Sequence, residues 1–92
     1  MAKVVTSVSK FFHSDPGHGW LAVKARELVE LGIANDITSY SFVKGKSVYL
    51  EEDADMATYI AAQEARGVTV NVRRGRFWKD RCPVRYFKRY TV

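Results

Sequence analysis

The chain has 92 residues, 47% of them apolar, which fits one small globular domain and excludes an intrinsically disordered chain. Its apolar runs are all far shorter than the roughly 18 residues of a membrane span, and the start lacks a secretory-signal pattern. We therefore expect neither a membrane span nor export. The single cysteine, Cys82, cannot form an intramolecular disulfide, which favours a reducing compartment.

The positive charge is concentrated at the C-terminal end. Residues 1–72 hold seven Lys or Arg and nine Asp or Glu, a net charge of −2. Residues 73–92, which we call the basic segment, hold eight Lys or Arg against Asp80 alone, a net charge of +7. The two parts sum to the +5 of the whole chain.

The N-terminal third predicts a hairpin. Residues 1–9 contain valines among polar residues and fit either an extra edge strand or a loosely held terminus. Two short apolar runs follow, at residues 10–13 and 20–23. Between them Pro16 and Gly17 suit the central positions of a type II turn, so the runs should pair across a tight loop.

Residues 24–31 have the pattern of a short amphipathic helix, with Leu28 and Leu31 facing the core. Gly32 is suited to the left-handed conformation just after the helix. Ile33 can then fold back on Leu28, so a Schellman motif is predicted at this end.

A second hairpin is predicted from residues 37–43 and 47–51, which are rich in β-branched and aromatic residues. A three-residue loop places the aromatic residues of the first strand on the face of the aliphatic residues of the second, and burial favours it. A two-residue loop places them opposite Ser47 and Tyr49. Turn chemistry conflicts with the longer loop, because its left-handed position falls on Lys46 rather than Gly45, unless a bulge intervenes. The residues placed by this choice are Tyr40, Phe42, Val48 and Leu50.

Residues 54–66 predict a second helix, because Met56, Tyr59 and Ile60 recur at helical spacing among alanines. Asp53 is the expected N-cap residue and Gly67 the expected residue after the helix. Further acidic residues near the helix start, Glu51, Glu52 and Asp55, suit the positive end of the helix dipole. The alternating valines of residues 68–72 then predict a half-buried strand.

The predicted order of elements is ββαββαβ. Two hairpins favour antiparallel pairing, and the strands alternate rather than being apolar throughout. We therefore expect one α+β domain over residues 1–92, with a mainly antiparallel sheet and both helices on one face.

The loop of the first hairpin carries His13, Asp15 and His18, which suggests a metal or acid–base site. A zinc site needs three or four ligands and Cys82 is the only other soft ligand, so a structural role is favoured, with Asp15 starting the turn. A small enzyme or metal protein that uses residues 13–18 is kept as an alternative. The secondary candidate binding residues in this loop are Asp15, His18 and Trp20.

Motifs of catalysis are missing from the sequence. It has no nucleophile elbow, phosphate-binding loop or dinucleotide fingerprint. The helix dipole explains the acidic residues 51–55 better than a calcium site does. We therefore predict no enzyme activity, no cofactor and no metal.

The basic segment is the main candidate binding site, because arginines that suit phosphates alternate with flat rings that suit stacking. The same composition suits a protein interface, where Arg, Trp and Tyr are frequent hot-spot residues. In a third interpretation the aromatic residues Phe77, Trp78, Tyr86 and Phe87 only attach a last strand to the core. The candidate binding residues are Arg73, Arg74, Arg76, Phe77, Trp78, Lys79, Arg81, Arg85, Lys88 and Arg89.

Several short patterns carry a resemblance: SDPGHGWL at 14–21, LGI at 31–33, Ile37 with SYS at 39–41, and YLEED at 49–53 with Asp55. Over roughly residues 12–72 the chain resembles a group of small uncharacterised proteins encoded by bacteriophages and prophages. Ala54 stands where that group has a cysteine, and the basic segment matches the group least. The resemblance implies an accessory gene of a mobile element, acting in the bacterial cytoplasm by binding rather than by catalysis.

By analogy with small phage proteins, the leading prediction is a non-catalytic inhibitor of a bacterial defence system, of anti-CRISPR or anti-restriction type. Its partner would be a bacterial protein or ribonucleoprotein complex. A DNA mimic is disfavoured, because mimics need a strongly acidic surface. The alternative is an accessory protein that binds DNA or RNA with the basic segment.

Overall fold

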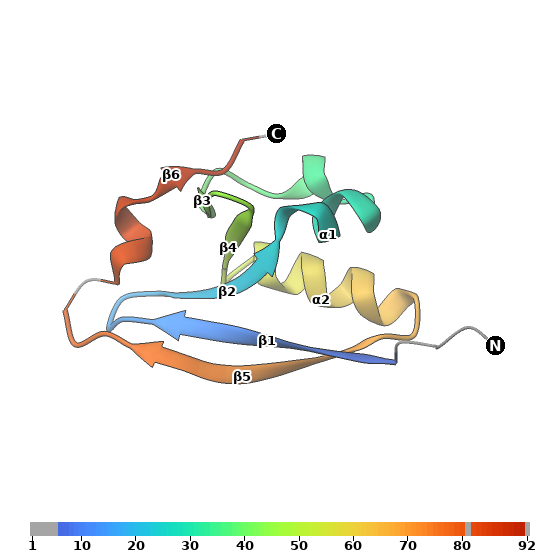
Figure 1. Cartoon of the computed structure of the whole chain (residues 1–92), viewed down its shortest axis with the longest axis horizontal. Helices are drawn as coiled ribbons and strands as arrows, with labels where there is room; N and C mark the ends of the chain where they lie inside the picture. The colour runs from blue at the N-terminus through green and yellow to red at the C-terminus, as the bar shows by residue number, and fades with distance from the viewer. Residues whose placement is uncertain (1–5, 81, 92) are drawn as a thin grey trace.

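The computed structural model describes residues 6–80 and 82–91, so the predictions for residues 1–5 and for Arg81 lie outside the described residues. Residues 7–9 extend the first predicted strand. In chain order the elements are β1 (Ser7–Ser14), β2 (Gly19–Lys24), α1 (Ala25–Glu30), the 3-10 turn η1 (Ala34–Asp36), β3 (Phe42–Lys44), β4 (Ser47–Glu51), α2 (Asp55–Ala65), β5 (Thr69–Phe77), the 3-10 turn η2 (Pro83–Tyr86) and β6 (Lys88–Arg89) (Figure 1).

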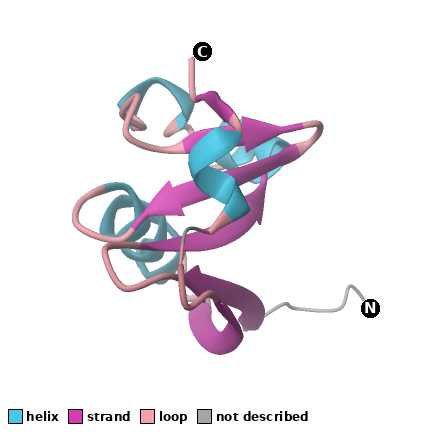
Figure 2. Ribbon diagram, turned by 90° about the vertical axis from the view of Figure 1, so that its left-hand side faces the viewer, coloured by secondary structure: helices cyan, strands magenta, loops and turns pink. Residues whose placement is uncertain are grey.

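The strands form one six-stranded sheet in the order β5-β1-β2-β4-β3-β6, which runs through the molecule in Figure 2. All neighbouring strands are antiparallel except β1 and β5, which are parallel. Both helices pack on one face, because Leu28 of α1 and Tyr59 of α2 share a core cluster with Leu21 and Val48 of the sheet. The predicted α+β domain, with a mainly antiparallel sheet and two helices on one face, is confirmed. Within the described ranges no helix is long and apolar enough to cross a membrane.

Both helices end at the predicted glycines. After α1, the N–H of Ile33 donates to the carbonyl of Leu28 at 2.9 Å, and Gly32 has a φ of 72°. After α2, Gly67 has a φ of 79°. The Schellman motif expected from Gly32 and Ile33 is therefore confirmed.

The start of α2 differs from the prediction, because Ala54 and not Asp53 is the N-cap residue. The carboxylate of Glu51 accepts the N–H of Asp53, which fixes the backbone just before the helix. The cap makes no side-chain hydrogen bond. The first turn contains the buried acidic residue Asp55.

Asp55 is buried at the start of α2 and determines the conformation of residues 38–41. Its carboxylate accepts hydrogen bonds from the N–H of Thr38 at 3.1 Å, from the Thr38 hydroxyl at 2.7 Å and from the Ser41 hydroxyl at 2.5 Å. These bonds hold residues 38–41 as a turn against the helix. The strand predicted over residues 37–43 is therefore wrong, and only Phe42–Lys44 forms β3.

The second hairpin has the two-residue loop, so the favoured three-residue loop is wrong. Phe42 pairs with Tyr49. Gly45 has a φ of 59° at the first loop position, as a type II′ turn requires. The sheet has a second apolar cluster on the face away from the helices, and Phe42 packs there against Trp20. Burial on this second face decides the register.

The first hairpin is confirmed, but its loop is not a type II turn, because Gly17 lacks the positive φ that this turn needs. The Asp15 carboxylate closes the loop instead, accepting the N–H groups of Gly17 and His18 at 3.0 Å each. The last long strand, β5, continues past its predicted end at residue 72, because it pairs with β1 as far as Phe77.

Leu28→Ala should lower the free energy of unfolding by about 2–5 kcal/mol, because Leu28 is fully buried in the main core. Val29→Ala is the matched control on the same helix, since Val29 is 70% exposed, and it should change stability by less than about 0.5 kcal/mol. Urea denaturation measures both. Equal losses in the two variants would contradict the core assignment.

Candidate nucleic-acid interface

The fold divides the basic segment into two parts. Residues 73–77 complete β5 at one edge of the sheet, whereas residues 83–89 contain η2 and β6 and reach the other edge. Between the two, Trp78 packs against the second apolar cluster, on the sheet face away from the helices. The candidate binding residues are therefore spread over both edges of the sheet.

The C-terminal half of β5 carries exposed arginines on an edge strand, namely Arg73, Arg74 and Arg76. Parallel pairing with β1 places Arg73 beside Phe11 and Arg74 beside Phe12. Because successive side chains of a strand alternate, Arg73 and Arg74 point to opposite faces. Positive charge therefore lines both sides of this edge.

A shift in strand register near the end of β1 brings Arg76 next to His13. A Cβ atom at Gly75 would lie 2.8 Å from the Phe12 carbonyl oxygen and 2.9 Å from His13 Nδ1, so this close approach requires glycine. The N–H of Arg76 donates to His13 Nδ1 at 3.3 Å. Partial burial lowers the pKa of His13, so the ring is neutral near pH 7 and offers a flat, uncharged surface.

Exposed aromatic rings lie next to these arginines. Phe11 is 54% exposed and Phe77 is 59% exposed. The guanidinium carbon of Arg76 lies 4.0 Å from the centre of the Trp78 ring, a cation–π contact. A groove of about 390 Å³ is lined by Arg73, Arg74 and Phe77. We call this edge of the sheet the β5 patch; on one face it presents Phe11, His13, Arg73 and Arg76, and on the other Arg74 and Phe77.

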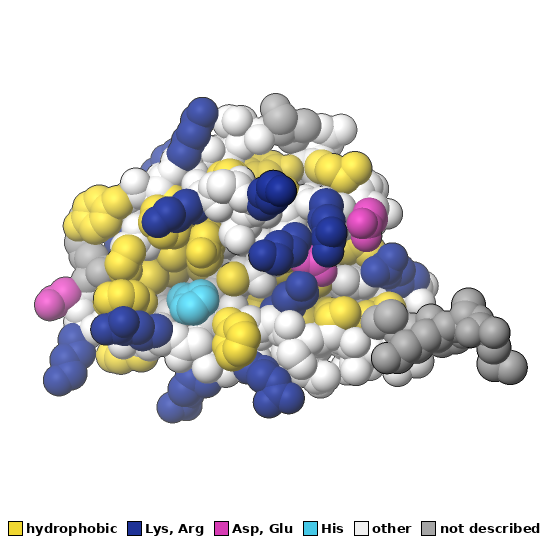
Figure 3. Space-filling model, in the orientation of Figure 1, with side chains coloured by type: hydrophobic (Ala, Val, Ile, Leu, Met, Phe, Trp, Pro, Cys, Tyr) yellow, Lys and Arg dark blue, Asp and Glu magenta, His cyan; other side chains and the backbone are white. Residues whose placement is uncertain are grey.

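On the face of the molecule in Figure 3, Lys and Arg side chains outnumber Asp and Glu side chains. They extend over the region where β1 and β5 lie in Figure 1, with hydrophobic side chains and a histidine between them. Asp and Glu side chains are few on this face. Such a surface attracts polyanions, and this electrostatic attraction weakens as the salt concentration rises.

Arg85 is engaged within the protein by Asp15. Its Nη2 lies 2.7 Å from Asp15 Oδ1, and the Asp15 side chain is only 1% exposed. Asp15 Oδ2 accepts the Arg85 Nε–H and also the backbone N–H of Cys82 at 2.9 Å. The Arg85 guanidinium and these N–H groups hold the pKa of Asp15 well below its usual range. A Cβ atom at Gly17 would lie 2.6 Å from Arg85 Nη2, so the loop glycine makes room for the pair.

The candidate loop and the basic segment therefore form one unit, which sequence reasoning treated as two separate sites. Trp20 is only 2% exposed and forms the centre of the second apolar cluster. Trp78 and Phe87 pack around it, as expected if aromatic residues attach this segment to the core, whereas Phe77 and Tyr86 are exposed. The sequence signals for the pairing of Asp15 with Arg85 are an aspartate in a loop and several arginines downstream. These signals do not indicate which arginine forms the pair.

The remaining candidates lie around η2 and β6. Lys79 and Lys88 are exposed, and Arg89 donates from Nη1 to the carbonyl of Ser39 at 3.0 Å. His18 is exposed, with its ring centre 6.1 Å from that of Trp20.

Comparisons with protein-family models, with curated proteins and with solved structures give no match. Among residues 6–80 and 82–91, no group of three or more His, Cys, Asp and Glu side chains lies close enough to hold a metal ion. The geometry and charge of the surface are thus the basis for a functional assignment.

Asp15→Asn should destabilise the protein by on the order of 3 kcal/mol at neutral pH, because it removes the buried charge that pairs with Arg85. The folded-state pKa of Asp15 is lowered, so its stabilisation is present above the ordinary aspartate pKa of about 4 and is lost as pH falls below it. The difference between wild type and variant should therefore shrink in acid. Urea denaturation across the acidic range measures this.

Asp80→Asn is the control for that experiment, because Asp80 is exposed. It should change stability by less than about 0.5 kcal/mol at every pH. A penalty for Asp15→Asn that stays constant into strong acid would contradict the role of the ionised carboxylate.

Proposed function

We propose that the protein binds single-stranded nucleic acid through the β5 patch. The observation that carries the proposal is the combination of exposed arginines on β5 with exposed rings beside them on β1 and at the end of β5. Cationic grooves with aromatic platforms are the usual means of binding single strands, because phosphates follow the cations while bases stack on the rings.

The geometry favours a single strand over a duplex. A duplex is read mainly by a helix or ribbon inserted in the major groove. Here α1 has only six residues, α2 has no basic residue in its last turn, and both pack on the sheet. The exposed rings of the β5 patch can instead stack on bases only where those bases are unpaired.

The arginines supply the electrostatic part of the affinity. The register shift places Arg76 beside His13, two β1 residues beyond the partner of Arg73, so at about 3.3 Å per strand residue the two arginines are about 7 Å apart along the edge and their charges follow an extended backbone. Each phosphate that they neutralise releases counterions, which makes affinity fall with salt. Arg85, which lies outside the β5 patch, is engaged by Asp15. The arginines of β5 therefore supply the positive charge for phosphate binding.

Replacing Arg73, Arg74 and Arg76 together by Ala should weaken binding of a single-stranded oligonucleotide of mixed sequence. It should also reduce the magnitude of the slope of log affinity against log salt concentration by about 2, since each of the three single-strand contacts contributes about 0.7 to that slope. Fluorescence anisotropy over a salt series measures both quantities. The matched control replaces Arg26, Lys46 and Arg66, which are exposed elsewhere, and an equal change in this control would contradict a specific role of the patch.

Phe11→Ala should weaken the same binding by about 1–3 kcal/mol, the usual contribution of one stacked base. The salt slope should stay unchanged, because the variant removes a ring and no charge. Val29→Ala, which truncates an exposed side chain on α1, is the control. Retention of full affinity by the Phe11 variant would mean that bases do not stack on this face.

A second candidate is binding of a bacterial protein or ribonucleoprotein complex by η2 and β6, in keeping with the predicted inhibition of a defence system. The exposed Tyr86 beside the exposed Lys88 and Arg89 favours it, since Tyr and Arg are frequent interface hot spots. Nuclease digestion separates the two functions. A complex held through nucleic acid is lost on digestion, and one held through protein persists.

A further inference from the structure

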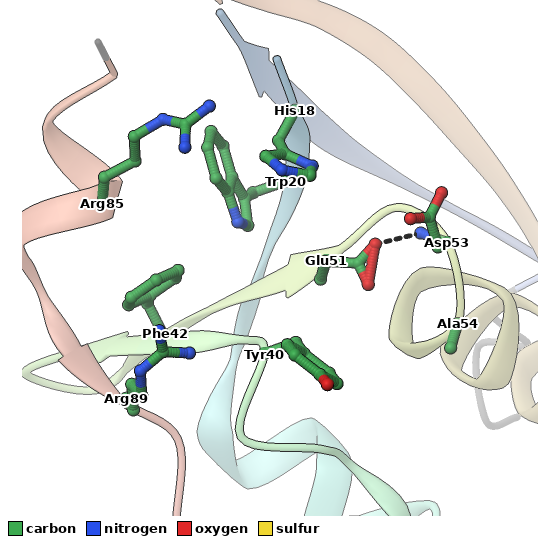
Figure 4. A pocket seen from close by; sticks show the side chains of 9 residues that line it. All are labelled: His18, Trp20, Tyr40, Phe42, Glu51, Asp53, Ala54, Arg85 and Arg89. Atoms are coloured by element: carbon green, nitrogen blue, oxygen red, sulfur yellow. Dashed lines mark hydrogen bonds between the residues drawn. The ribbon is translucent and has the colours of Figure 1, made fainter.

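A cleft of about 550 Å³ borders the second apolar cluster (Figure 4). Trp20 and Phe42 form its inner wall, and Tyr40 stands at its edge with 69% of its surface exposed. The position of Tyr40 is fixed by the bonds of Asp55 to Thr38 in the same turn. A cleft of this volume suits a ligand of mononucleotide size.

Opposite charges lie on opposite sides of these rings in Figure 4. Arg85 and Arg89 stand on one side, and the carboxylates of Glu51 and Asp53 stand on the other. Glu51 uses one carboxylate oxygen for the N–H of Asp53 and keeps the other for a ligand. Arg89 uses Nη1 for the Ser39 carbonyl and keeps its remaining donors.

This arrangement selects the chemistry of a ligand. Arg89 suits an anion such as phosphate, the exposed ring of Tyr40 suits a flat ring, and the carboxylates accept hydrogen bonds but cannot donate them. Among the nucleobases, guanine alone presents two adjacent N–H donors on its Watson–Crick edge, whereas the others place an acceptor beside each donor. A carboxylate therefore favours guanine and repels the other bases.

We propose that the cleft binds one guanine nucleotide, with the base on Tyr40, its N–H donors on Glu51 and its phosphate on Arg89. The inference rests on the proposed function, because the nucleotide is taken to belong to the bound strand. Trp20 pairs with His13 on one neighbouring strand and with Glu51 on the other. His13, Trp20 and Glu51 therefore form a row across three strands. Because neighbouring strands are about 4.8 Å apart, this row is about 10 Å long and connects the β5 patch with the cleft.

The test compares binding of guanosine, adenosine, cytidine and uridine monophosphates by calorimetry. The guanine nucleotide should bind about tenfold more tightly than the others, since a hydrogen bond to a charged acceptor gives about that discrimination. Glu51→Gln should abolish the preference, because the amide keeps the bond to Asp53 but presents a donor to the base. Arg89→Ala should remove the difference in affinity between guanosine monophosphate and guanosine.

Two exposed residues provide the controls. Glu52→Gln and Lys46→Ala alter residues that do not line the cleft, and both should keep the wild-type preference. Strand binding that depends on the three β5 arginines, together with equal affinity for all four nucleotides, would overturn the guanine site and leave the proposed function standing. Binding of the guanine nucleotide without binding of any strand would overturn both the proposed function and the assignment of the cleft to a strand.

Discussion

The Asp15 carboxylate connects two parts of the chain that are 70 residues apart in sequence. It closes the loop between β1 and β2, accepts the N–H of Cys82 and pairs with Arg85 at η2. The pairing holds the C-terminal segment against the sheet face that the helices leave uncovered. The second apolar cluster and the wall of the cleft both depend on this attachment, because Cys82, Val84 and Arg85 all lie in the segment that Asp15 holds.

Local signals in the sequence were sufficient for the ends of the helices and for the two hairpins, but not for the other three strand pairings of the sheet. Gly32 and Gly67 mark the helix ends because only a left-handed residue fits there, and that requirement is independent of the rest of the fold. The predicted strand over 37–43 failed for the opposite reason. Its composition favours a strand, but the buried carboxylate of Asp55, 17 residues from Thr38, holds its first part as a turn.

The candidate site shows the same division between local and distant causes. Composition identified the arginines and rings of the basic segment, yet it could not show that Arg85 is used internally or that Phe11 joins Arg73 and Arg76. That second grouping arises from the parallel pairing of β1 with β5, which joins residues about 60 positions apart. The two-residue loop of the second hairpin was considered but not favoured, because burial was judged against one apolar face while the sheet has two.

β5 is an edge strand of nine residues, and in the described part of the chain its outer side has no partner strand. Long edges of this kind tend to pair with other copies of the same protein, and charged side chains on the edge prevent it. Arg73, Arg74 and Arg76 therefore repel a second copy that approaches along β5. Phosphates that neutralise these arginines remove the repulsion, so the edge is protected from self-association in the free protein and loses that protection when a polyanion is bound.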